Sequence, residues 1–437
     1  MLGWSMKRVD FVLFYEHVPR EFSSVMRLKK VLESQGLRGV IFPKHFYKYL
    51  AVVAFNPRVI VLPYLYSERN DQHLMFESVY GEIPVLNLHS EQLHDETTKA
   101  FQMPHDDYAR CCFHISWGER FADALKDHGV PVDLIFKAGS IRNDDTFFKS
   151  RMKSDGFRVL IPTAFSKTFV SEEYIKKLTA LDAIDEEMYL EKVEYTRKVR
   201  DCFFRDVFKL SLDNRNVQFV FRPHPYVELD EYEKVFCRVN GVSSLPSNVK
   251  VERNGSVQND IASALKVITW YSSTALDAYL MGRDVIVYEP VETPQYMKIG
   301  FMDYFKSTSD IVGLDSFLNS PVTEINECID SYIGEVYGDV DGRSCERVAS
   351  VIRKIARNDD VLRVNKRVYI IMLLKVLYID IPKVILNKLG ILPLFKPFYK
   401  GVQHDNVVDL SLNEVESVVD ANVKFKKNQN GIRVEIR

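Results

Sequence analysis

The 437-residue sequence predicts an α/β protein with two doubly wound, Rossmann-like domains facing a central cleft, followed by a helical, basic and apolar C-terminal extension. Three observations lead to this prediction. Short apolar runs rich in β-branched and aromatic residues alternate with helix-length intervals, as in strands buried on both faces of a parallel sheet. This series begins twice, in a chain too long for one ordinary core. The composition then shifts after Asp360.

The first predicted domain spans residues 1–150. It opens with a strand over Asp10–Tyr15 and an amphipathic helix over Ser23–Gln35, which Gly36 ends. Its further strands are Val40–Phe42, Val59–Leu62, Val85–Leu88 and Cys112–Ser116. Gly139–Asp144 closes the domain, and its small and polar residues predict a loop on the hinge side.

The second predicted domain spans residues 157–343, after a polar bridge at 150–156. Its strands are Arg158–Pro162, Val217–Phe221, Val249–Glu252, Val267–Trp270 and Val285–Tyr288. A long helix with charged, solvent-facing residues is predicted over Leu181–Leu210. Residues 344–360 predict a closing helix. Two such halves joined by a short bridge predict a ligand cleft between them.

Residues 361–437 form the extension. Its first part, 364–400, mixes lysine and arginine with aliphatic and aromatic residues, and prolines at 382, 393 and 397 interrupt it. The resulting pieces are shorter than the ~20 residues that a membrane-spanning helix needs. The pattern leaves two interpretations open. One is an element in the plane of a membrane surface, giving peripheral membrane contact, and the other is a helical subdomain packed on the body.

Composition and motifs exclude several classes of function. The formal net charge is -2, from 58 basic and 60 acidic residues, which argues against a nucleic-acid partner. Six cysteines without a CxxC pair predict free thiols in a reducing compartment, and no secretory signal pattern is recognised, so we expect a cytoplasmic protein. Glycine-rich phosphate loops and HExxH motifs are absent, and we expect neither a metal nor a cofactor.

Two polar clusters follow predicted strands of the second domain. Arg222 and His224, the latter flanked by prolines, end the run that begins at Val217. The second cluster stands ahead of a helical stripe and consists of Ser272, Ser273 and Thr274. Parallel strands present their carboxyl ends at one edge of a sheet, and these groups suit a phosphate, so both clusters are predicted to bind a donor. His224 is also a catalytic candidate, because a protonated imidazole neutralises a departing phosphate.

Further donor-site candidates follow strands of the same domain. Glu289 comes after the strand that ends at Tyr288, where it would accept hydrogen bonds from ribose hydroxyls. Thr163 and Ser166 follow the first strand of the domain and are predicted to line the donor site. Plain structural interpretations stay open beside these. One hydroxyl suffices to cap a helix, a loop histidine bonds a neighbouring carbonyl, and a carboxylate is at home on the surface.

The first domain offers carboxylates. Glu91 follows the strand Val85–Leu88, where a carboxylate would take a proton from an attacking hydroxyl and serve as the catalytic base. Arg20 and Glu21 follow the first strand and are predicted at the same rim. Arg20 would bind an anionic acceptor there, or pair with a neighbouring glutamate. Arg142, in the closing loop, is predicted to line the acceptor side of the cleft.

Several short motifs occur in order between Val9 and Pro290. They are Arg20-Glu21, His89-Ser-Glu-Gln-Leu93, Trp117-Gly-Glu119, Gly139-Ser-Ile-Arg-Asn-Asp144, Arg222-Pro-His-Pro225 and Ser272-Ser-Thr274 with Gly282. Their order resembles that of bacterial surface-carbohydrate biosynthesis proteins, inverting transferases of the two-domain GT-B type that are related to sialyl- and Kdo-transferases and to CDP-glycerol glycerophosphotransferases.

The resemblance implies roles for particular residues. His224 with Arg222, and Ser273 with Thr274, would hold the phosphate of a cytidine nucleotide donor, and Glu91 would be the base. The chain departs from the pattern at one point. Where relatives often have two acidic residues followed by glycine, His89-Ser90-Glu91-Gln92 contains a single carboxylate.

Three functions from different classes follow. The leading one is an inverting, metal-independent glycosyltransferase that moves a sugar of Kdo or sialic-acid type from a nucleotide donor, with CMP favoured, to a surface glycan or lipid-linked glycan. The second is a nucleotide-sugar epimerase of the same architecture, which would act on the donor alone. The third is a non-catalytic scaffold in polysaccharide assembly, which would bind no nucleotide.

Overall fold

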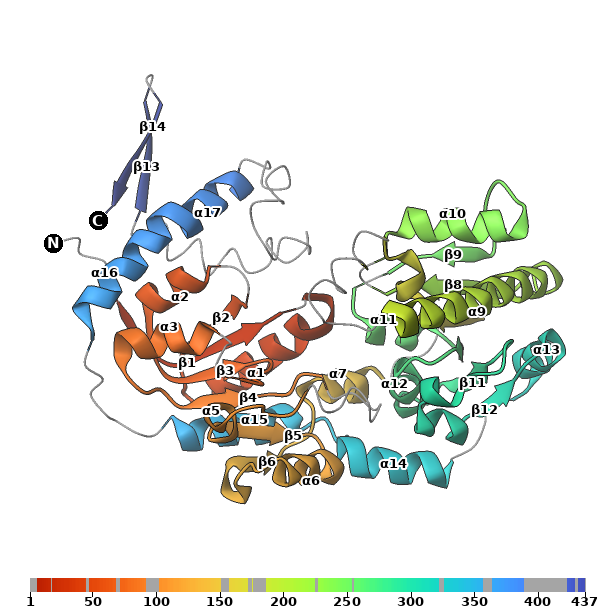
Figure 1. Cartoon of the computed structure of the whole chain (residues 1–437), viewed down its shortest axis with the longest axis horizontal. Helices are drawn as coiled ribbons and strands as arrows, with labels where there is room; N and C mark the ends of the chain where they lie inside the picture. The colour runs from red at the N-terminus through yellow and green to blue at the C-terminus, as the bar shows by residue number, and fades with distance from the viewer. Residues whose placement is uncertain are drawn as a thin grey trace. The chain divides into compact units, whose positions relative to one another are not determined.

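The chain forms two compact units, each built on one parallel six-stranded sheet (Figure 1). The computed structural model describes residues 6–16, 18–44, 47–67, 71–91, 102–150, 157–171, 175, 186–224, 227–253, 255–321, 326–356, 364–388, 423–428 and 431–436. Unit 1 comprises Met1–Asp145 and Gly334–Arg437, and unit 2 comprises Thr146–Ile333. The prediction of an α/β protein with two doubly wound sheets is therefore confirmed.

The sheet of unit 1 has the strand order β2-β1-β3-β4-β5-β6, and its neighbouring strands are parallel. The strands are β1 (Lys7–Tyr15), β2 (Gly39–Pro43), β3 (Phe55–Leu62), β4 (Val85–Asn87), β5 (Phe113–Ser116) and β6 (Ile135–Lys137). β1 pairs with β2 on one side and with β3 on the other. The direction of winding reverses between β1 and β3, so this is the topological switch point of unit 1.

Helices cover both faces of this sheet because side chains of β1 alternate between them. Phe11 and Leu13 pack toward α1 and α15, whereas Val12 and Phe14 pack toward α2 and α3. The helices are η1 (Val18–Phe22), α1 (Ser23–Ser34), α2 (Lys48–Ala54), α3 (Asp71–Tyr80), α5 (Asp107–Arg110), α6 (Glu119–Asp127), η3 (Val132–Leu134) and α15 (Ser344–Ile355). Two further helices, α7 (Ile141–Lys149) and α14 (Glu327–Tyr337), contain the boundaries between the units.

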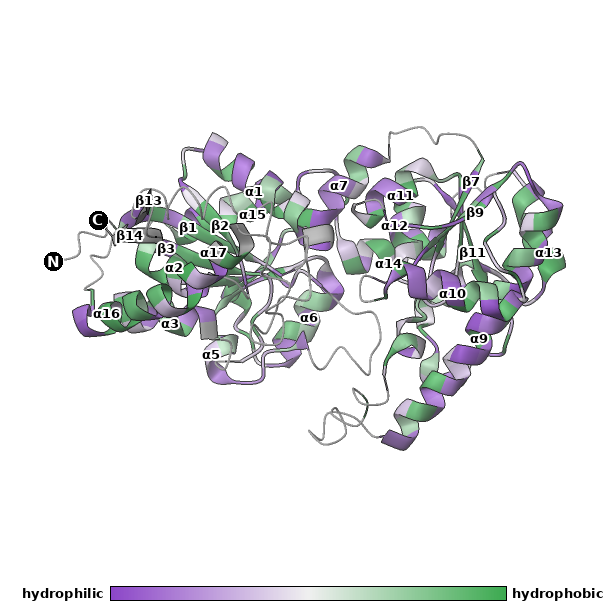
Figure 2. Cartoon of the chain, turned by 90° about the horizontal axis from the view of Figure 1, so that it is seen from above, coloured by the Kyte–Doolittle hydropathy of each residue, from purple (hydrophilic) through white to green (hydrophobic). Residues whose placement is uncertain are grey.

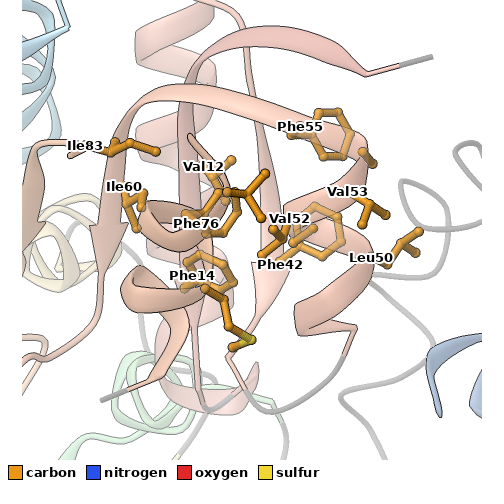
Figure 3. Packing of buried hydrophobic residues seen from close by; sticks show 14 of the residues in the cluster. Val12, Phe14, Phe42, Leu50, Val52, Val53, Phe55, Ile60, Phe76 and Ile83 are labelled. Carbon is orange, nitrogen blue, oxygen red and sulfur yellow. The ribbon is translucent and has the colours of Figure 1, made fainter. Parts of the chain in front are cut away.

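The core on the α2 and α3 side is rich in aromatic and branched side chains (Figure 3). Phe14 lies 6.3 Å from Phe76 in an edge-on arrangement and 6.5 Å from Phe42. Ile60 of β3 and Val53 of α2 belong to the same cluster and are fully buried. Each such side chain contributes about 1.5–3 kcal/mol when it leaves water. This packing fixes β1 and β3, whose carboxyl ends carry polar residues of the candidate site.

The sheet of unit 2 has the order β12-β11-β10-β7-β8-β9, also with parallel neighbours. Its strands are β7 (Arg158–Pro162), β8 (Gln218–Arg222), β9 (Val249–Val251), β10 (Lys266–Thr269), β11 (Asp284–Tyr288) and β12 (Lys306–Thr308). Numbered from the first strand, this is the 3-2-1-4-5-6 order of dinucleotide-binding sheets. The switch point of unit 2 lies between β7 and β10.

A long helix dominates the packing of unit 2. α9 (Glu186–Asp213) places Phe203 and Phe204 against β7 and β8, and Phe204 lies 5.1 Å from Phe236 of α10. The other helices are η4 (Ser166–Phe169), α10 (Leu229–Asn240), α11 (Val257–Ser263), α12 (Thr274–Leu280), η5 (Gln295–Met297), η6 (Gly300–Tyr304) and α13 (Ile311–Asn319). α11 contacts β7, and α12 contacts β10 and β11.

The helical segment of the extension packs on unit 1, which is one of the two predicted arrangements. α16 (Lys366–Lys375) continues through a π-helical turn, η7 (Val376–Asp380), into α17 (Ile381–Lys388), and this helical segment contacts α2. The carboxylate of Asp380 accepts a hydrogen bond from the Leu50 backbone at 2.9 Å. A hairpin of β13 (Val423–Asn428) and β14 (Gly431–Ile436) follows, while residues 389–400 of the predicted membrane element lie outside the described residues. No helix among the described residues is long and apolar enough to cross a bilayer.

The predicted loop over 139–144 is wrong from Ile141 onward, where α7 begins. Ser140 Oγ accepts a hydrogen bond from the Arg142 backbone N–H at 3.3 Å at the start of this helix. The small polar residues of the stretch favour a loop, so the sequence pattern did not reveal this local bond. Asp144 is buried and accepts from the backbone N–H groups of Ser344 and Cys345, both at 2.8 Å, so it caps α15.

Candidate functional site

The predicted donor-site residues of unit 2 follow strands that end at one edge of its sheet. Thr163 follows β7, His224 follows β8, Ser272 follows β10 and Glu289 follows β11. β7 and β10 are neighbours at the switch point, and they continue there as a bridge between Thr163 and Trp270. One strand, β7, separates β8 from β10, so the segments that follow them leave the sheet about 10 Å apart, which is two strand spacings.

The hydroxyl loop after β10 has a strained start. Tyr271 has φ 49°, a left-handed conformation that costs a residue with a side chain about 1–2 kcal/mol. Ser272 donates from Oγ to Thr274 Oγ1 at 3.0 Å and accepts from the Thr274 backbone at 3.3 Å. Ser272 and Thr274 therefore shape the loop, and Ser273 is the exposed member. α12 has seven residues, so the hydroxyls offer more to a ligand than a helix dipole does.

Arg222 is committed to contacts inside unit 2. Its guanidinium is 9% exposed, forms an ion pair with the buried carboxylate of Asp260, and donates to the Gly255 carbonyl at 2.8 Å. These bonds tie the end of β8 to α11 and to the turn before it. Sequence reasoning named Arg222 but missed Asp260, because a carboxylate inside a helical pattern resembles an ordinary surface residue.

His224 is exposed, and its backbone is held through its carbonyl oxygen. Its carbonyl accepts from Arg253 Nη1 at 2.8 Å and from the Val227 backbone at 2.9 Å. Burial and the neighbouring charge of Arg222 lower the pKa of Arg253. Arg253, two residues past β9, is thus a second cation at this edge that sequence reasoning missed. Its signal was its position just past a strand end.

Glu289 belongs to a polar group between β11 and α9. Thr293 donates to Glu289 Oε1 at 3.1 Å, and the Tyr195 hydroxyl donates to Thr293 Oγ1 at 3.0 Å. Burial raises the pKa of Tyr271, with a smaller contribution from Glu289, so this phenol keeps its proton at neutral pH. The predicted site residues did not include Tyr195, Tyr271 or Thr293. Tyr195 could not be predicted from a local pattern, because it lies on a helix far from β11 in the chain.

Thr163 and Ser166 lie beside the switch point. Thr163 is 8% exposed and accepts from the Tyr232 hydroxyl at 3.1 Å. Ser166 is half-buried and begins η4. Thr163 thus helps to hold α10 on the sheet, and Ser166 is the more accessible of the two hydroxyls.

The polar cluster of unit 1 begins at its own switch point. Tyr64, two residues past β3, donates to the carboxylate of Glu16, which directly follows β1. Lys44 Nζ lies 3.1 Å from the centre of the Tyr64 ring. Burial and the bond to Glu16 raise the pKa of Tyr64, so this side chain stays a donor. Sequence reasoning missed Tyr64 and Lys44, because their meeting depends on β1 lying between β2 and β3.

Arg20 joins two carboxylates in this cluster. It donates from Nη2 to Glu21 Oε1 at 2.8 Å and from Nη1 to Glu91 Oε2 at 2.7 Å. Burial opposes the charge of Arg20, but the two carboxylates outweigh it and raise the arginine pKa. Glu21 is 2% exposed and also accepts from the Glu16 backbone at 2.8 Å, whereas Glu91 is 48% exposed. Glu91 is therefore the carboxylate of this pair that a substrate can reach.

A buried histidine pair lies behind Glu91. His89 Nε2 and His114 Nδ1 are 2.9 Å apart, and His114 Nε2 is 2.9 Å from the Ala109 carbonyl. A carbonyl only accepts, so His114 donates through Nε2 and accepts from His89 through Nδ1. Burial lowers the pKa of both rings, that of His114 to about 4, so both are neutral at pH 7. His89 has φ 45° and sets the direction of the turn that leads to Glu91.

The structure thus brings Arg20, Glu21 and Glu91 together, as the sequence suggested for one rim. Arg142 lies half-buried in the first turn of α7, and in the described part of the chain its Nε is buried without a hydrogen-bond partner. In the described part of the chain, no hydrogen bond or ion pair joins the Arg142 side chain to that cluster. Among the described residues, no group of three or more His, Cys, Asp or Glu side chains is arranged to hold a metal ion.

Comparisons with known proteins define the architecture. No protein-family model matches the chain, and no curated protein matches its sequence. The chain is similar to a solved structure from Listeria monocytogenes assigned as a UDP-N-acetylglucosamine 2-epimerase, with TM-score 0.50 and 12% identity over 82% of this chain and 99% of the other. It is also similar to a variant of the wall teichoic acid polymerase TagF, with TM-score 0.50 and 12% identity over 80% of this chain and 90% of that one.

At this identity the likeness establishes the fold alone. The chain is an α/β protein of GT-B-like architecture, with polar residues gathered at the switch points of both sheets.

Proposed function

We propose that the chain is a glycosyltransferase that moves a sugar of Kdo or sialic-acid type from a nucleotide donor, with CMP favoured, to a glycan or lipid-linked glycan of the bacterial surface. Unit 2 takes the donor, and unit 1 takes the acceptor and supplies the base. One observation carries the proposal: in both sheets, polar side chains gather at the switch point, where α/β folds bind ligands. The fold shared with a teichoic acid polymerase and an assigned nucleotide-sugar epimerase supports an activated carbohydrate as substrate.

The donor phosphate is assigned to the exposed groups at the edge of unit 2. His224 and the hydroxyl of Ser273 bind it, and Arg253 is the adjacent cation. Arg222 holds this edge through Asp260, and its contribution to the phosphate is indirect. Of the remaining candidates, Glu289 accepts from the ribose hydroxyls, while Thr163, Ser166, Ser272 and Thr274 line and shape the site.

The proposed step is a single displacement with inversion. The acceptor oxygen attacks the anomeric carbon, the bond from that carbon to the donor phosphate oxygen breaks, and the nucleotide leaves with the electron pair. Glu91 takes the acceptor proton, and His224 neutralises the departing phosphate. Arg20 orients Glu91, and Arg20, Glu21 and Arg142 form the acceptor side. Protein groups fill these roles, so transfer is expected to persist in EDTA.

A thermal-shift screen tests the donor assignment. A ligand that binds the folded chain raises its melting temperature, and CMP, CDP, UDP and GDP offered singly would rank the nucleotides. We expect the largest shift with a cytidine nucleotide. A larger shift with UDP would replace CMP as the donor nucleotide, and no shift with any of them would favour a non-catalytic scaffold.

Substitution of the two catalytic candidates tests the step itself. We expect His224→Ala and Glu91→Gln each to lower the transfer rate about 100-fold or more, because each removes a proton-transfer or charge-stabilising group. Both side chains are exposed, so the melting temperature should stay unchanged. The exposed residues His128 and Glu346 provide matched controls, and His128→Ala and Glu346→Gln should keep full activity. Near-normal transfer by His224→Ala would overturn the assignment.

A nucleotide-sugar epimerase is the second candidate, favoured by the likeness to the Listeria protein. An epimerase converts its nucleotide sugar without an acceptor. Incubation of the purified chain with donor alone, followed by NMR of the sugar ring protons, separates the two functions. A transferase leaves the donor configuration unchanged or slowly hydrolyses it, whereas an epimerase yields a mixture of isomers.

We also propose that the protein works on the cytoplasmic side of the cell, peripherally at the inner face of the membrane. Residues 364–400, with their apolar and basic composition, support this location.

A further inference from the structure

The outer face of α16 and η7 carries apolar side chains in solvent. Ile370, Ile371, Leu374 and Tyr378 are 57%, 51%, 47% and 79% exposed. In the described part of the chain, twelve large hydrophobic side chains are exposed, and these four fall within nine residues. Positions three or four apart share one face of a helix, so the four residues form one stripe, called here the outer stripe.

The opposite face of the same helical segment is buried. Met372, Leu373, Val376 and Ile381 belong to the core cluster that includes Val53 of α2. A helix on the surface of a globular protein ordinarily turns a polar face outward. This segment is apolar on its outer side as well, and Figure 2 colours most of α16 as hydrophobic. We therefore expect the outer stripe to contact a second apolar environment in addition to the core.

The charges of the segment indicate which environment that is. Lys366 and Arg367 are exposed, and Arg367 stands three and four positions before Ile370 and Ile371, on the face of the outer stripe. The acidic residue of 364–388 is Asp380, which is buried and bonded to the Leu50 backbone. The helical segment thus presents apolar side chains with positive charge and no exposed carboxylate. That pairing is complementary to a bilayer surface with anionic headgroups.

We propose that the outer stripe binds the surface of a membrane that contains anionic lipid, with the helix lying in the plane of the bilayer. The apolar side chains enter the boundary between headgroups and acyl chains, while Lys366 and Arg367 reach lipid phosphates. This binding is independent of the donor and acceptor assigned above. It rests on the peripheral membrane location proposed above and assigns particular side chains and a lipid class to that contact.

Cosedimentation of the full chain with lipid vesicles tests the proposal. We expect binding to vesicles of phosphatidylcholine mixed with phosphatidylglycerol and much weaker binding to phosphatidylcholine alone. Removal of charge by Lys366→Gln with Arg367→Gln should weaken binding about fivefold for each residue. Ile371→Glu with Leu374→Glu should abolish it, and Leu212→Glu with Val312→Glu, at exposed apolar residues of unit 2, should not.

A second readout reports on insertion. Tyr378→Trp places a fluorophore at a position that is 79% exposed, and brominated lipids should quench its added emission. All substituted positions are exposed, so circular dichroism should match the unchanged chain. Equal binding by the Ile371→Glu/Leu374→Glu variant, or no binding of the full chain to anionic vesicles, overturns the proposal. If the unchanged chain does not bind anionic vesicles and the Ile371→Glu/Leu374→Glu variant changes its oligomeric state, the outer stripe contacts a second copy of the chain instead.

Discussion

Arg222 and Arg253 are neighbouring cations at the carboxyl ends of β8 and β9, and their surroundings differ. Arg222 is nearly buried and forms an ion pair with Asp260, while Arg253 is half-buried and donates a hydrogen bond to the carbonyl of His224. An enclosed ion pair is strongly destabilising to break, because one charge is left without its partner. A partly exposed arginine keeps its hydration and remains able to meet a ligand.

The two arginines should therefore separate stability from binding. We expect Arg222→Ala to lower the free energy of unfolding by about 3 kcal/mol, since Asp260 keeps Arg158 at 3.7 Å but loses its main partner. Arg253→Ala should lower it by less than about 1 kcal/mol yet weaken nucleotide binding. Urea denaturation and the nucleotide thermal shift measure the two effects. If Arg222→Ala loses nucleotide binding while its free energy of unfolding stays unchanged, Arg222 binds the donor phosphate directly.

The His89–His114 pair makes the turn before Glu91 sensitive to acid. In the folded chain both rings bind protons more weakly than a free histidine, whose pKa is about 6.5. The unfolded chain therefore takes up protons first as the pH falls. Stability from this pair is complete above pH 6.5 and is lost between 6.5 and the folded pKa, which is about 4 for His114.

The variant His114→Gln isolates this effect. A glutamine can accept from His89 and donate to the Ala109 carbonyl, but it does not titrate. We expect the unchanged chain to lose about 3 kcal/mol more than the variant between pH 6.5 and 4, which corresponds to the lowered pKa of His114. Denaturation curves at several pH values measure this difference. Parallel pH profiles for the two chains would contradict it.

The sequence pattern predicted where strands end more accurately than which side chains contact one another. An apolar run that stops at polar residues marks the end of a strand, and Glu91, His224 and Ser272 were found in this way. Which side chains meet depends on strand order, which a local pattern does not contain. Arg20 reaches Glu91 across 71 positions, and Tyr64 reaches Glu16 across 48.

At the scale of elements, Asp144 links two segments that are 200 residues apart. It sits in α7 and accepts from the first two N–H groups of α15, whose other side packs on α1. The first N–H groups of a helix have no partner inside it, so a buried helix start needs such an acceptor. One carboxylate therefore completes a helix that covers one face of the unit 1 sheet.

Removal of this acceptor should cost more than removal of an exposed cap. We expect Asp144→Ala to lower the free energy of unfolding by about 2–5 kcal/mol, because two buried N–H groups lose their partner. Asp310, whose exposed carboxylate accepts from the Gly313 backbone at 2.8 Å at the start of α13, provides the control. Asp310→Ala should cost about 1 kcal/mol. Equal losses in urea denaturation would mean that water replaces Asp144.

The two strands of the main sheets that the sequence did not predict are short and lie at sheet edges. β6 has three residues that are half-buried or exposed, and the edge strand β12 consists of Lys306, Ser307 and Thr308. Strands at a sheet edge need no continuous apolar run, so the pattern that revealed β1 and β8 was missing there. The helix pattern of α1 and α15 was predicted because each buries a single stripe.

At the scale of the molecule, the chain leaves unit 1 between Asp145 and Thr146 and returns between Ile333 and Gly334. Unit 2 is therefore continuous in sequence, whereas unit 1 combines two separate segments. Both α/β domains were predicted, but the return of the chain was not, because α14 and α15 resemble any helices that end a domain. Their assignment to unit 1 depends on contacts with α1 and with Trp117, whose ring stacks on Tyr337 at 5.6 Å.

Unit 2 should fold when it is made alone. We expect residues 146–333 to unfold in one cooperative transition and to bind the same nucleotide as the full chain, with a Kd within about a factor of three. Circular dichroism and calorimetry measure these properties. Residues 1–145 alone should fail the same tests, because they lack α15 and the extension helices. A disordered 146–333 fragment would show that unit 2 needs the rest of the chain.

This arrangement also bears on synthesis at the ribosome. Because translation proceeds from the N-terminus, the whole inserted segment emerges before α15 exists, and the nascent sheet of unit 1 meanwhile has one face partly bare. The middle of the polypeptide can thus reach its native state ahead of the part that was translated first. Chaperone contact during that interval would protect the exposed surface of β1 until α15 is synthesised.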